Sequence, residues 1–295
     1  MSSPPASDAS KQYERWIHLA TRASVATAVV LILAKLAAWL LSGSASLLAS
    51  LTDSMMDAMA SLVNFYALRL ALQPADHHHR FGHGKAEPLA TLAQSGFILG
   101  SAMLLLFHGV ERVFSPVEVS HSGLGIGVTL FAILATLLLL AIQRRAVAAT
   151  GSTAIAADAL HYRSDLLLNG AVLLALALAQ WGMAWADGAF AVVIALYIGW
   201  GAAGLGHEAV QLLLDREADP DIRLKVVELV EQDGNVRGIH DLRTRVSGNT
   251  LCVQMHLELD AQLLLRDAHA IADGVEQRIR RAFPHADIIV HQDPV

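Results

Sequence analysis

Six long apolar segments constrain this chain more than any other feature of its sequence. They occupy residues 16–41, 46–72, 89–114, 122–143, 151–180 and 187–213. Each is long enough to cross the hydrocarbon core of a bilayer, which takes about 20 residues in a helix. The sequence therefore predicts an α-helical polytopic membrane protein with six transmembrane helices.

Charged side chains divide the chain into unlike parts. Residues 1–214 contain 11 basic and 12 acidic residues, whereas the much shorter stretch 215–295 contains 10 basic and 15 acidic residues. An ordinary soluble domain has about 25 % charged residues, so only the first part is depleted. We expect an N-terminal tail at 1–15, a membrane domain at 16–214 and a soluble domain at 215–295. The net charge of −6 gives no basis for binding nucleic acid.

The basic residues of the membrane part gather on one side of the expected helices. They are Lys11, Arg15 and Arg22 near the first segment, Arg69, Arg80 and Lys85 around the second connection, and Arg144 and Arg145 near the fourth. Because basic residues are enriched in cytoplasmic loops, we expect both termini to be cytoplasmic. An even number of spans agrees with that placement.

The C-terminal domain follows a helix–strand–strand–helix–strand pattern. The expected elements are 221–231, 238–246, 250–259, 266–283 and 287–291, with the turn Ser247-Gly248-Asn249 between the first two strands. This order predicts an α+β domain with a ferredoxin-like or metallochaperone-like arrangement.

Four ionisable side chains lie inside the apolar segments. Asp53 and Asp57 are four residues apart in the second segment, and His161 and Asp165 are four apart in the fifth, so each pair shares one helical face. Such groups are costly in a membrane and are usually functional. At about 1.5 Å per residue, their expected depths overlap, so neighbouring helices would bring them together. One nitrogen and three oxygens suit tetrahedral Zn²⁺, and Fe²⁺, Cd²⁺ and Mn²⁺ accept the same donors.

A structural interpretation of the same residues is that each acid caps a broken helix or pairs with a buried base. Lys35 in the first segment and Arg163 in the fifth are the available bases. Two separate pairs at helical spacing favour the metal site over this alternative.

Histidines form two further clusters. The run 76–83 between the second and third segments reads Asp-His-His-His-Arg-Phe-Gly-His, and it is either a metal site or a solvated polar turn. The C-terminal domain contains His240, His256, His269, His285, His291 and Asp293. His291 and Asp293 are two apart on a strand and share a face, and the density of these residues favours metal binding.

The motifs together resemble the cation diffusion facilitator family, and most closely its bacterial zinc and ferrous-iron exporters. The resemblance rests on the DxxxD and HxxxD pairs and on the segments Gln73-Pro74-Ala75-Asp76, Phe81-Gly82-His83-Gly84-Lys85-Ala86-Glu87, Leu160-His161-Tyr162, Asp241-Leu242-Arg243-Thr244-Arg245 and His291-Gln292-Asp293-Pro294. It covers nearly the whole chain.

The resemblance implies three metal sites. Asp53, Asp57, His161 and Asp165 would form the transport site, Asp76, His79 and His83 the loop site, and His240, His256, His269, His291 and Asp293 a site in the C-terminal domain. Lys85 and Asp215 match an interdomain charge pair. The resemblance also implies a homodimer in the bacterial inner membrane that exchanges metal for protons.

Proton exchange agrees with the chemistry of the expected site. Three carboxylates and an imidazole in one buried site do not all stay ionised without a cation, and metal binds the deprotonated forms. We expect His161 and Asp57 to couple protons to transport by alternating access. Two other functions remain open at this point: a membrane-anchored metal sensor without flux, and an intramembrane metalloenzyme, for which no hydrolytic motif is present.

Overall fold

The computed structural model describes residues 8–43, 45–115, 123–179, 181, 183 and 185–295. The first seven residues of the expected N-terminal tail 1–15 lie outside the described residues. The structure contains two compact units, one formed by residues 1–70 and 86–210, and the other by residues 71–85 and 211–295. The connection 71–85 therefore belongs with the C-terminal domain, although it interrupts the membrane helices in the sequence.

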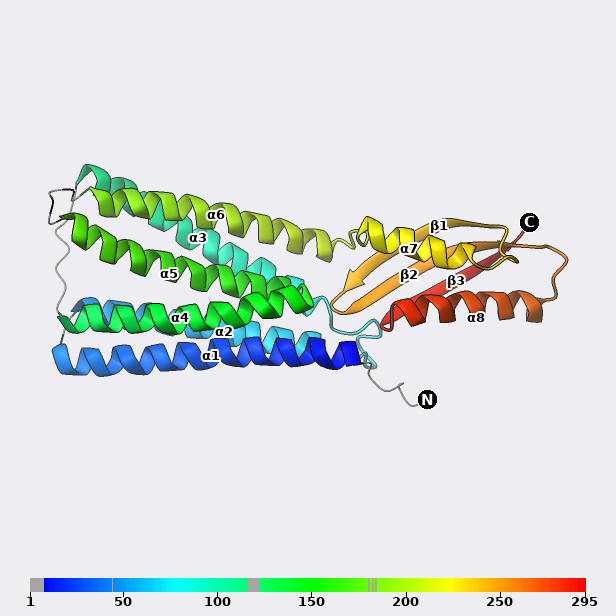
Figure 1. Ribbon diagram of the computed structural model, residues 1–295, viewed down its shortest axis with the longest axis horizontal. Coiled ribbons are helices and arrows are strands. Elements are labelled where there is room, and N and C mark those ends of the chain that lie inside the picture. The colour runs from blue at the N-terminus through cyan, green and yellow to red at the C-terminus, as the bar shows by residue number, and fades with distance from the viewer. Residues whose placement is uncertain (1–7, 44, 116–122, 180, 182, 184) are drawn as a thin grey trace. The chain divides into compact units, whose positions relative to one another are not determined.

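The first unit is a bundle of long helices (Figure 1). They are α1 (Asp8–Ser42), α2 (Ala45–Ala71), α3 (Ala86–Phe114), α4 (Gly123–Thr150), α5 (Thr153–Ala179) and α6 (Ala186–Leu213). α1 begins eight residues before the expected start of the first segment. Gly43 and Gly151 follow α1 and α4 with φ values of 64° and 66°, a left-handed conformation that favours glycine after a helix.

Four of these helices are long and apolar enough to cross a membrane: α1, α3, α4 and α6. α2 and α5 are long enough, at 27 residues each, but they carry the acidic residues Asp53, Asp57 and Asp165 and are not among these four. Small residues such as Ala157, Ala202 and Ala209 are fully buried in the bundle, as expected where membrane helices approach closely. The architecture is that of a helical membrane domain.

The second unit contains the expected α+β domain. Its elements are α7 (Pro220–Glu231), β1 (Gly238–Ser247), β2 (Thr250–Leu259), α8 (Leu265–Ala282) and β3 (Ala286–Pro294). The sheet order is β1-β2-β3, with β1 antiparallel and β3 parallel to β2. Asp219 caps α7 by accepting the backbone N–H of Asp221 at 3.0 Å, and Pro220 occupies the first turn, where no donor is needed.

One face of this sheet forms the hydrophobic core. Alternate residues of β2, including Val253, Met255 and Leu257, are buried against Val226 of α7 and Ile279 of α8. The residues between them point to the opposite face. The core therefore leaves one face of the sheet for polar side chains.

Candidate metal centre

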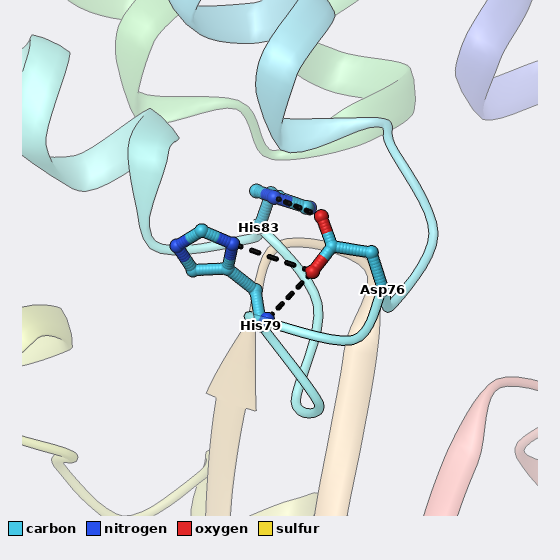
Figure 2. A group of neighbouring side chains, drawn as sticks. All are labelled: Asp76, His79 and His83. Carbon is cyan, nitrogen blue, oxygen red and sulfur yellow. Dashed lines mark hydrogen bonds and ion pairs between the residues drawn. The ribbon is translucent and has the colours of Figure 1, made fainter.

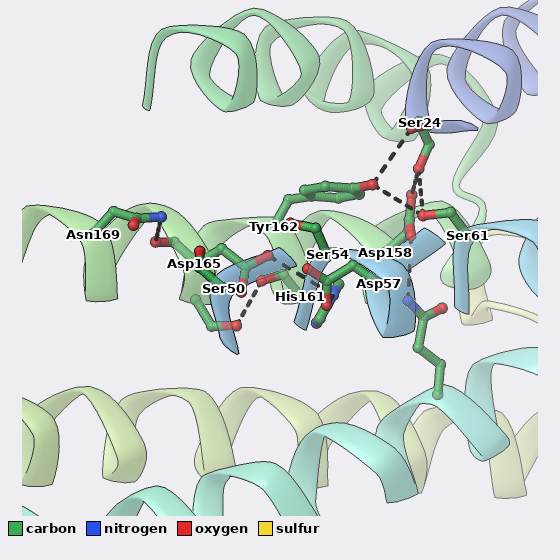
Figure 3. A network of polar contacts seen from close by, with 12 residues as sticks. Ser24, Ser50, Ser54, Asp57, Ser61, Asp158, His161, Tyr162, Asp165 and Asn169 are labelled. Atoms are coloured by element: carbon green, nitrogen blue, oxygen red, sulfur yellow. Dashed lines mark hydrogen bonds and ion pairs between the residues drawn. The ribbon is translucent and has the colours of Figure 1, made fainter. Parts of the chain in front are cut away.

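The acidic and histidine residues of α2 and α5 meet inside the helical unit. His161 Nε2 lies 2.9 Å from Asp57 Oδ1 and 3.8 Å from Asp165 Oδ2. Figure 3 shows the three side chains directed toward one another from the two helices. One ligand atom from each lies within 4.8 Å of the others, which is compact enough for a single cation to contact all three.

A cavity of about 610 Å³ opens onto this group. Asp53, Asp57, His161 and Asp165 all line it, so the four residues expected from the sequence face one space. Asp53 is exposed and does not belong to the close group of three. The reason is geometric: one helical turn separates Asp53 from Asp57, and Asp57 is the acid of α2 that contacts the imidazole.

The two bases that could have neutralised these acids bind other groups. The Lys35 ammonium donates to the Ser54 hydroxyl at 2.6 Å and to the Ser50 carbonyl at 3.1 Å, both on α2. The Arg163 guanidinium donates to the Tyr197 hydroxyl at 3.3 Å. Within the described residues neither base is ion-paired with Asp53, Asp57 or Asp165, so the structural alternative of simple ion pairs does not describe these acids.

The loop between α2 and α3 forms a second group (Figure 2). Asp76 Oδ1 accepts the backbone N–H of His79 at 2.6 Å, and the His79 and His83 rings each bring a nitrogen within 3.5 Å of the carboxylate. Gly82, with φ of 80°, turns the chain so that His83 comes back toward Asp76. The backbone hydrogen bond from His79 holds the pKa of Asp76 below its usual range. His77 and His78 are not members of this group.

This loop packs on the β1–β2 hairpin within the second unit. A Cβ atom added to Gly84 would lie 2.6 Å from the Ser247 carbonyl oxygen, so only glycine fits this contact. Lys85 Nζ lies 3.0 Å from Asp215 Oδ1, and Arg245 reaches the same oxygen at 2.9 Å. The loop group is therefore attached to the C-terminal domain by both packing and charge.

A third group lies on the open face of the C-terminal sheet. His240, His256 and His291 occupy paired positions on β1, β2 and β3. Asp293 Oδ2 lies 2.8 Å from His256 Nδ1 and 3.1 Å from His240 Nε2, and its Oδ1 lies 3.1 Å from His291 Nε2. The hydrogen bond with His256 holds the pKa of Asp293 below its usual range. One carboxylate thus connects three imidazoles across the sheet.

A β-bulge positions the first of these histidines. The register of β1 against β2 shifts between His240 and Arg243, and Asp241 adopts a left-handed φ of 50°. Bulges commonly redirect side chains next to functional sites. Here the bulge lies immediately after His240, where β1 meets His256.

Comparison with known families identifies both parts of the chain. The family model of the cation efflux transmembrane domain matches residues 21–214, and that of the cation efflux protein cytoplasmic domain matches residues 218–295. This chain belongs to the cation efflux, or cation diffusion facilitator, family.

Relatives named "Cation-efflux pump FieF" match almost the whole chain. The protein of Shewanella oneidensis is 58 % identical over 284 residues, which cover 96 % of each chain. That of Serratia proteamaculans is 49 % identical over 283 residues, covering 96 % of this chain and 94 % of its own. A solved structure, the metal-bound C-terminal domain of the CzcD transporter from Thermotoga maritima, covers 25 % of this chain and 87 % of its own at 23 % identity and a TM-score of 0.25.

His269 stands apart from the third group, on the C-terminal sheet of this cation efflux protein. It is exposed on α8, where its nearest charged partner is Asp273 at 3.6 Å. α8 covers the apolar face of the sheet, whereas the three strand histidines occupy the other face. The helix therefore holds His269 away from Asp293 within this chain.

Two polar residues that the sequence did not assign to any metal group lie beside these groups in the structure. Glu258 Oε1 lies 3.0 Å from His240 Nδ1, a contact that follows from the pairing of β1 with β2. His108 of α3 lines the membrane cavity beside the metal group. Glu258 lies two residues after His256 on β2, a spacing that places both on one face of the sheet. His108 stands at no recognisable spacing, so only the fold associates it with the site.

The most deeply buried of the overlooked residues is Asp158, one turn before His161 on α5. Its side chain is 2 % exposed and accepts hydrogen bonds from three other helices. The donors are Ser24 of α1 at 2.7 Å, Gln143 of α4 at 2.7 Å and Gln94 of α3 at 3.3 Å. Figure 3 shows that the Ser24 hydroxyl also forms a hydrogen bond, of 3.0 Å, with the Ser61 hydroxyl of α2. Asp158 thus connects α5 with the helices around it.

Proposed function

We propose that this cation efflux protein exports a divalent metal cation, most consistently Zn²⁺, in exchange for protons, and that it does so as a homodimer. The observation that carries the proposal is the convergence of Asp57, His161 and Asp165 in a cavity that Asp53 also lines. Within the described residues neither Lys35 nor Arg163 is ion-paired with these carboxylates, and ionisable donors gathered inside a membrane domain favour a cationic substrate.

The donor set supports Zn²⁺ as the transported ion, although Fe²⁺, Cd²⁺ and Mn²⁺ accept the same donor atoms. Zn²⁺ prefers four ligands in tetrahedral geometry and accepts nitrogen and carboxylate oxygen. Asp57, His161 and Asp165 would supply three ligands, and Asp53, on the same wall of the cavity, would supply the fourth. Fe²⁺, Cd²⁺ and Mn²⁺ bind the same donor types, so direct comparison of the metals is part of the test.

The contact between His161 and Asp57 supports the proposed proton exchange. At 2.9 Å the Nε2 and Oδ1 atoms share one hydrogen bond, and both are atoms that a metal would use. A cation that binds them must displace the proton, since ligands bind metal in their deprotonated form. Release of the metal on the other side would let His161 and Asp57 take up a proton again, and alternating access would couple the two movements.

The two other groups fit a regulatory role for cytoplasmic metal. His240, His256 and Asp293 place donor atoms within 4.8 Å of one another, as do Asp76, His79 and His83. We propose that metal on the sheet group stabilises the homodimer and raises transport. The Lys85–Asp215 pair would hold the loop to the C-terminal domain. In the proposed topology all these groups face the cytoplasm, six helices cross the bacterial inner membrane, and both termini are cytoplasmic.

Purified protein in liposomes would test the proposal. A metal-sensitive dye inside the vesicles reports entry of Zn²⁺, Fe²⁺, Cd²⁺ or Mn²⁺ after a pH step across the membrane. We expect pH-driven entry, and its loss in Asp57→Ala but not in the control Glu111→Gln, an exposed acid on α3. Metal flux of the same rate with and without the pH step would refute proton exchange but would still support metal export. Metal binding without any flux would instead identify a membrane-anchored sensor.

A further inference from the structure

A groove on the helical unit carries two arginines that the metal sites do not use. It lies between α4, α5 and α6 and has a volume of about 340 Å³. Arg144 of α4 and Arg163 of α5 line it, together with Tyr197 and Trp200 of α6. Among the described residues that line the groove, none is acidic. The groove therefore combines positive charge with an aromatic wall.

Among the residues that the structure describes, neither arginine has an acidic partner. Arg163 donates only to the neutral hydroxyl of Tyr197 at 3.3 Å, and within the described part of the chain no carboxylate lies within ion-pair distance of Arg163 or Arg144. Both side chains are exposed. Because an unpaired arginine is costly in a membrane and normally finds an anion or water, the groove calls for an anionic occupant.

The depth of the two arginines suits a lipid headgroup. Arg144 lies six residues before the end of α4 at Thr150, and Arg163 lies ten residues after the start of α5 at Thr153. At about 1.5 Å per residue, these positions are roughly 9 and 15 Å from the same end of the bundle. The helices are about 40 Å long, some 10 Å more than the hydrocarbon core. Both guanidinium groups can therefore extend toward the interface.

The rest of the groove suits an acyl chain. Trp200 is 85 % exposed and Tyr197 is 49 % exposed, and both lie near the middle of α6, at the depth of the acyl chains in a bilayer. Leu140 and Leu205 are among the apolar residues that line the rest of the groove. A small soluble anion would leave this surface uncovered, whereas an amphiphile with an anionic head would match both parts.

We propose that this groove binds an anionic phospholipid, with its phosphate between Arg144 and Arg163 and an acyl chain along Trp200 and Leu205. In the proposed topology this end of α4 and α5 is cytoplasmic, the side on which basic pockets between membrane helices bind acidic headgroups. The inference does not depend on which metal is carried or on proton exchange.

Brominated lipids provide a direct test, because bromine quenches the fluorescence of a tryptophan that it touches. The protein would retain Trp200 as its single tryptophan, with the other four replaced by phenylalanine. It would be reconstituted in mixtures containing brominated phosphatidylglycerol or brominated phosphatidylethanolamine. Two arginines at an anionic headgroup predict a preference for phosphatidylglycerol of roughly tenfold.

Variants then assign the preference to the groove. We expect it to disappear in Arg144→Gln/Arg163→Gln and to persist in Arg145→Gln, whose side chain is adjacent in sequence but does not line the groove. Equal quenching by the two lipids in the parent protein would overturn the proposal, and this measurement needs no arginine variant to fold. Equal losses in the Arg145→Gln control would also overturn it. If neither brominated lipid quenched Trp200, and quenching appeared once the protein was dissociated into monomers, a second copy of the chain would cover the groove and the proposal would be overturned.

Discussion

Replacing Asp158 tests whether one buried carboxylate holds the membrane helices together. Asp158→Ala removes the acceptor of three hydrogen bonds, from Ser24, Gln94 and Gln143, in a site that is almost inaccessible to water. Each buried donor left without a partner costs about 1–3 kcal/mol. Since the helices can relax, the losses will not add fully, and we expect a total of about 3–5 kcal/mol.

Asp158→Asn separates the hydrogen bonds from the charge. An amide oxygen in the place of Oδ2 keeps the two 2.7 Å bonds from Ser24 and Gln143. Its NH₂ group would then face Gln94, whose Oε1 is buried without a partner. Rotation of the Gln94 amide would let that oxygen accept the new donor. We therefore expect Asp158→Asn to cost only about 1 kcal/mol.

Reversible unfolding in detergent micelles, followed by circular dichroism, would measure both differences. The exposed acid Glu111 supplies a control, and Glu111→Gln should lie within about 0.5 kcal/mol of the parent protein. If Asp158→Ala matched this control, the network would not stabilise the bundle. If Asp158→Asn lost as much as Asp158→Ala, the charge itself, and not the hydrogen-bonding geometry, would be the source of the stability.

Three further predictions concern the C-terminal unit. In Gly84→Ala the new Cβ would lie 2.6 Å from the Ser247 carbonyl oxygen of the hairpin, so the loop should move away and the amides of 71–85 should exchange hydrogen faster. Gly234→Ala is the control, because no atom lies within 4 Å of its Cβ, and it should leave this exchange unchanged. Asp293→Asn should weaken Zn²⁺ binding to the full-length protein, measured by calorimetry, by roughly 10–100-fold, because the Asp293 carboxylate contacts all three strand imidazoles. An equal loss of affinity in Asp273→Asn would contradict this prediction. Burial acts to raise the pKa of Asp215, but its bonds to Lys85 and Arg245 outweigh that effect and lower the pKa. Its stabilisation is thus present above the unfolded value of about 3.9 and is lost as the pH falls through the folded pKa. Asp215→Asn should lower stability by about 1 kcal/mol or less at pH 7 and by nothing below the folded pKa; a loss that persists there would show that the ion pairs are not its cause.

Helical periodicity predicted which residues of the site in the helical unit share a face, but it did not predict which of them make contact. The spacing of four residues put Asp57 beside Asp53, and Asp165 beside His161, on shared faces. Which acid reaches the imidazole depends on the rotation of α2 against α5. In the structure Asp57 bonds His161, while Asp53 lines the cavity one turn away.

Strand and helix pattern likewise predicted the elements of the C-terminal domain, and the structure confirms its α+β fold. The pattern did not reveal that His269 would point away from the strand histidines. That outcome depends on which face of the sheet α8 covers, and hydrophobic packing of Ile279 against the sheet decides it. Glu258 joins His240 only through the register of β1 against β2.

The sequence by itself determined a helical membrane domain, an α+β domain after it and the three places where candidate metal ligands concentrate. These follow from hydrophobic length, alternation and local spacing, which are properties of neighbouring residues. Only the tertiary structure decided which ligands meet, that the loop 71–85 packs with the C-terminal domain, and that Asp158 joins α5 to three other helices. Those contacts join residues up to 134 positions apart, and they depend on how whole helices pack, which short-range spacing does not encode.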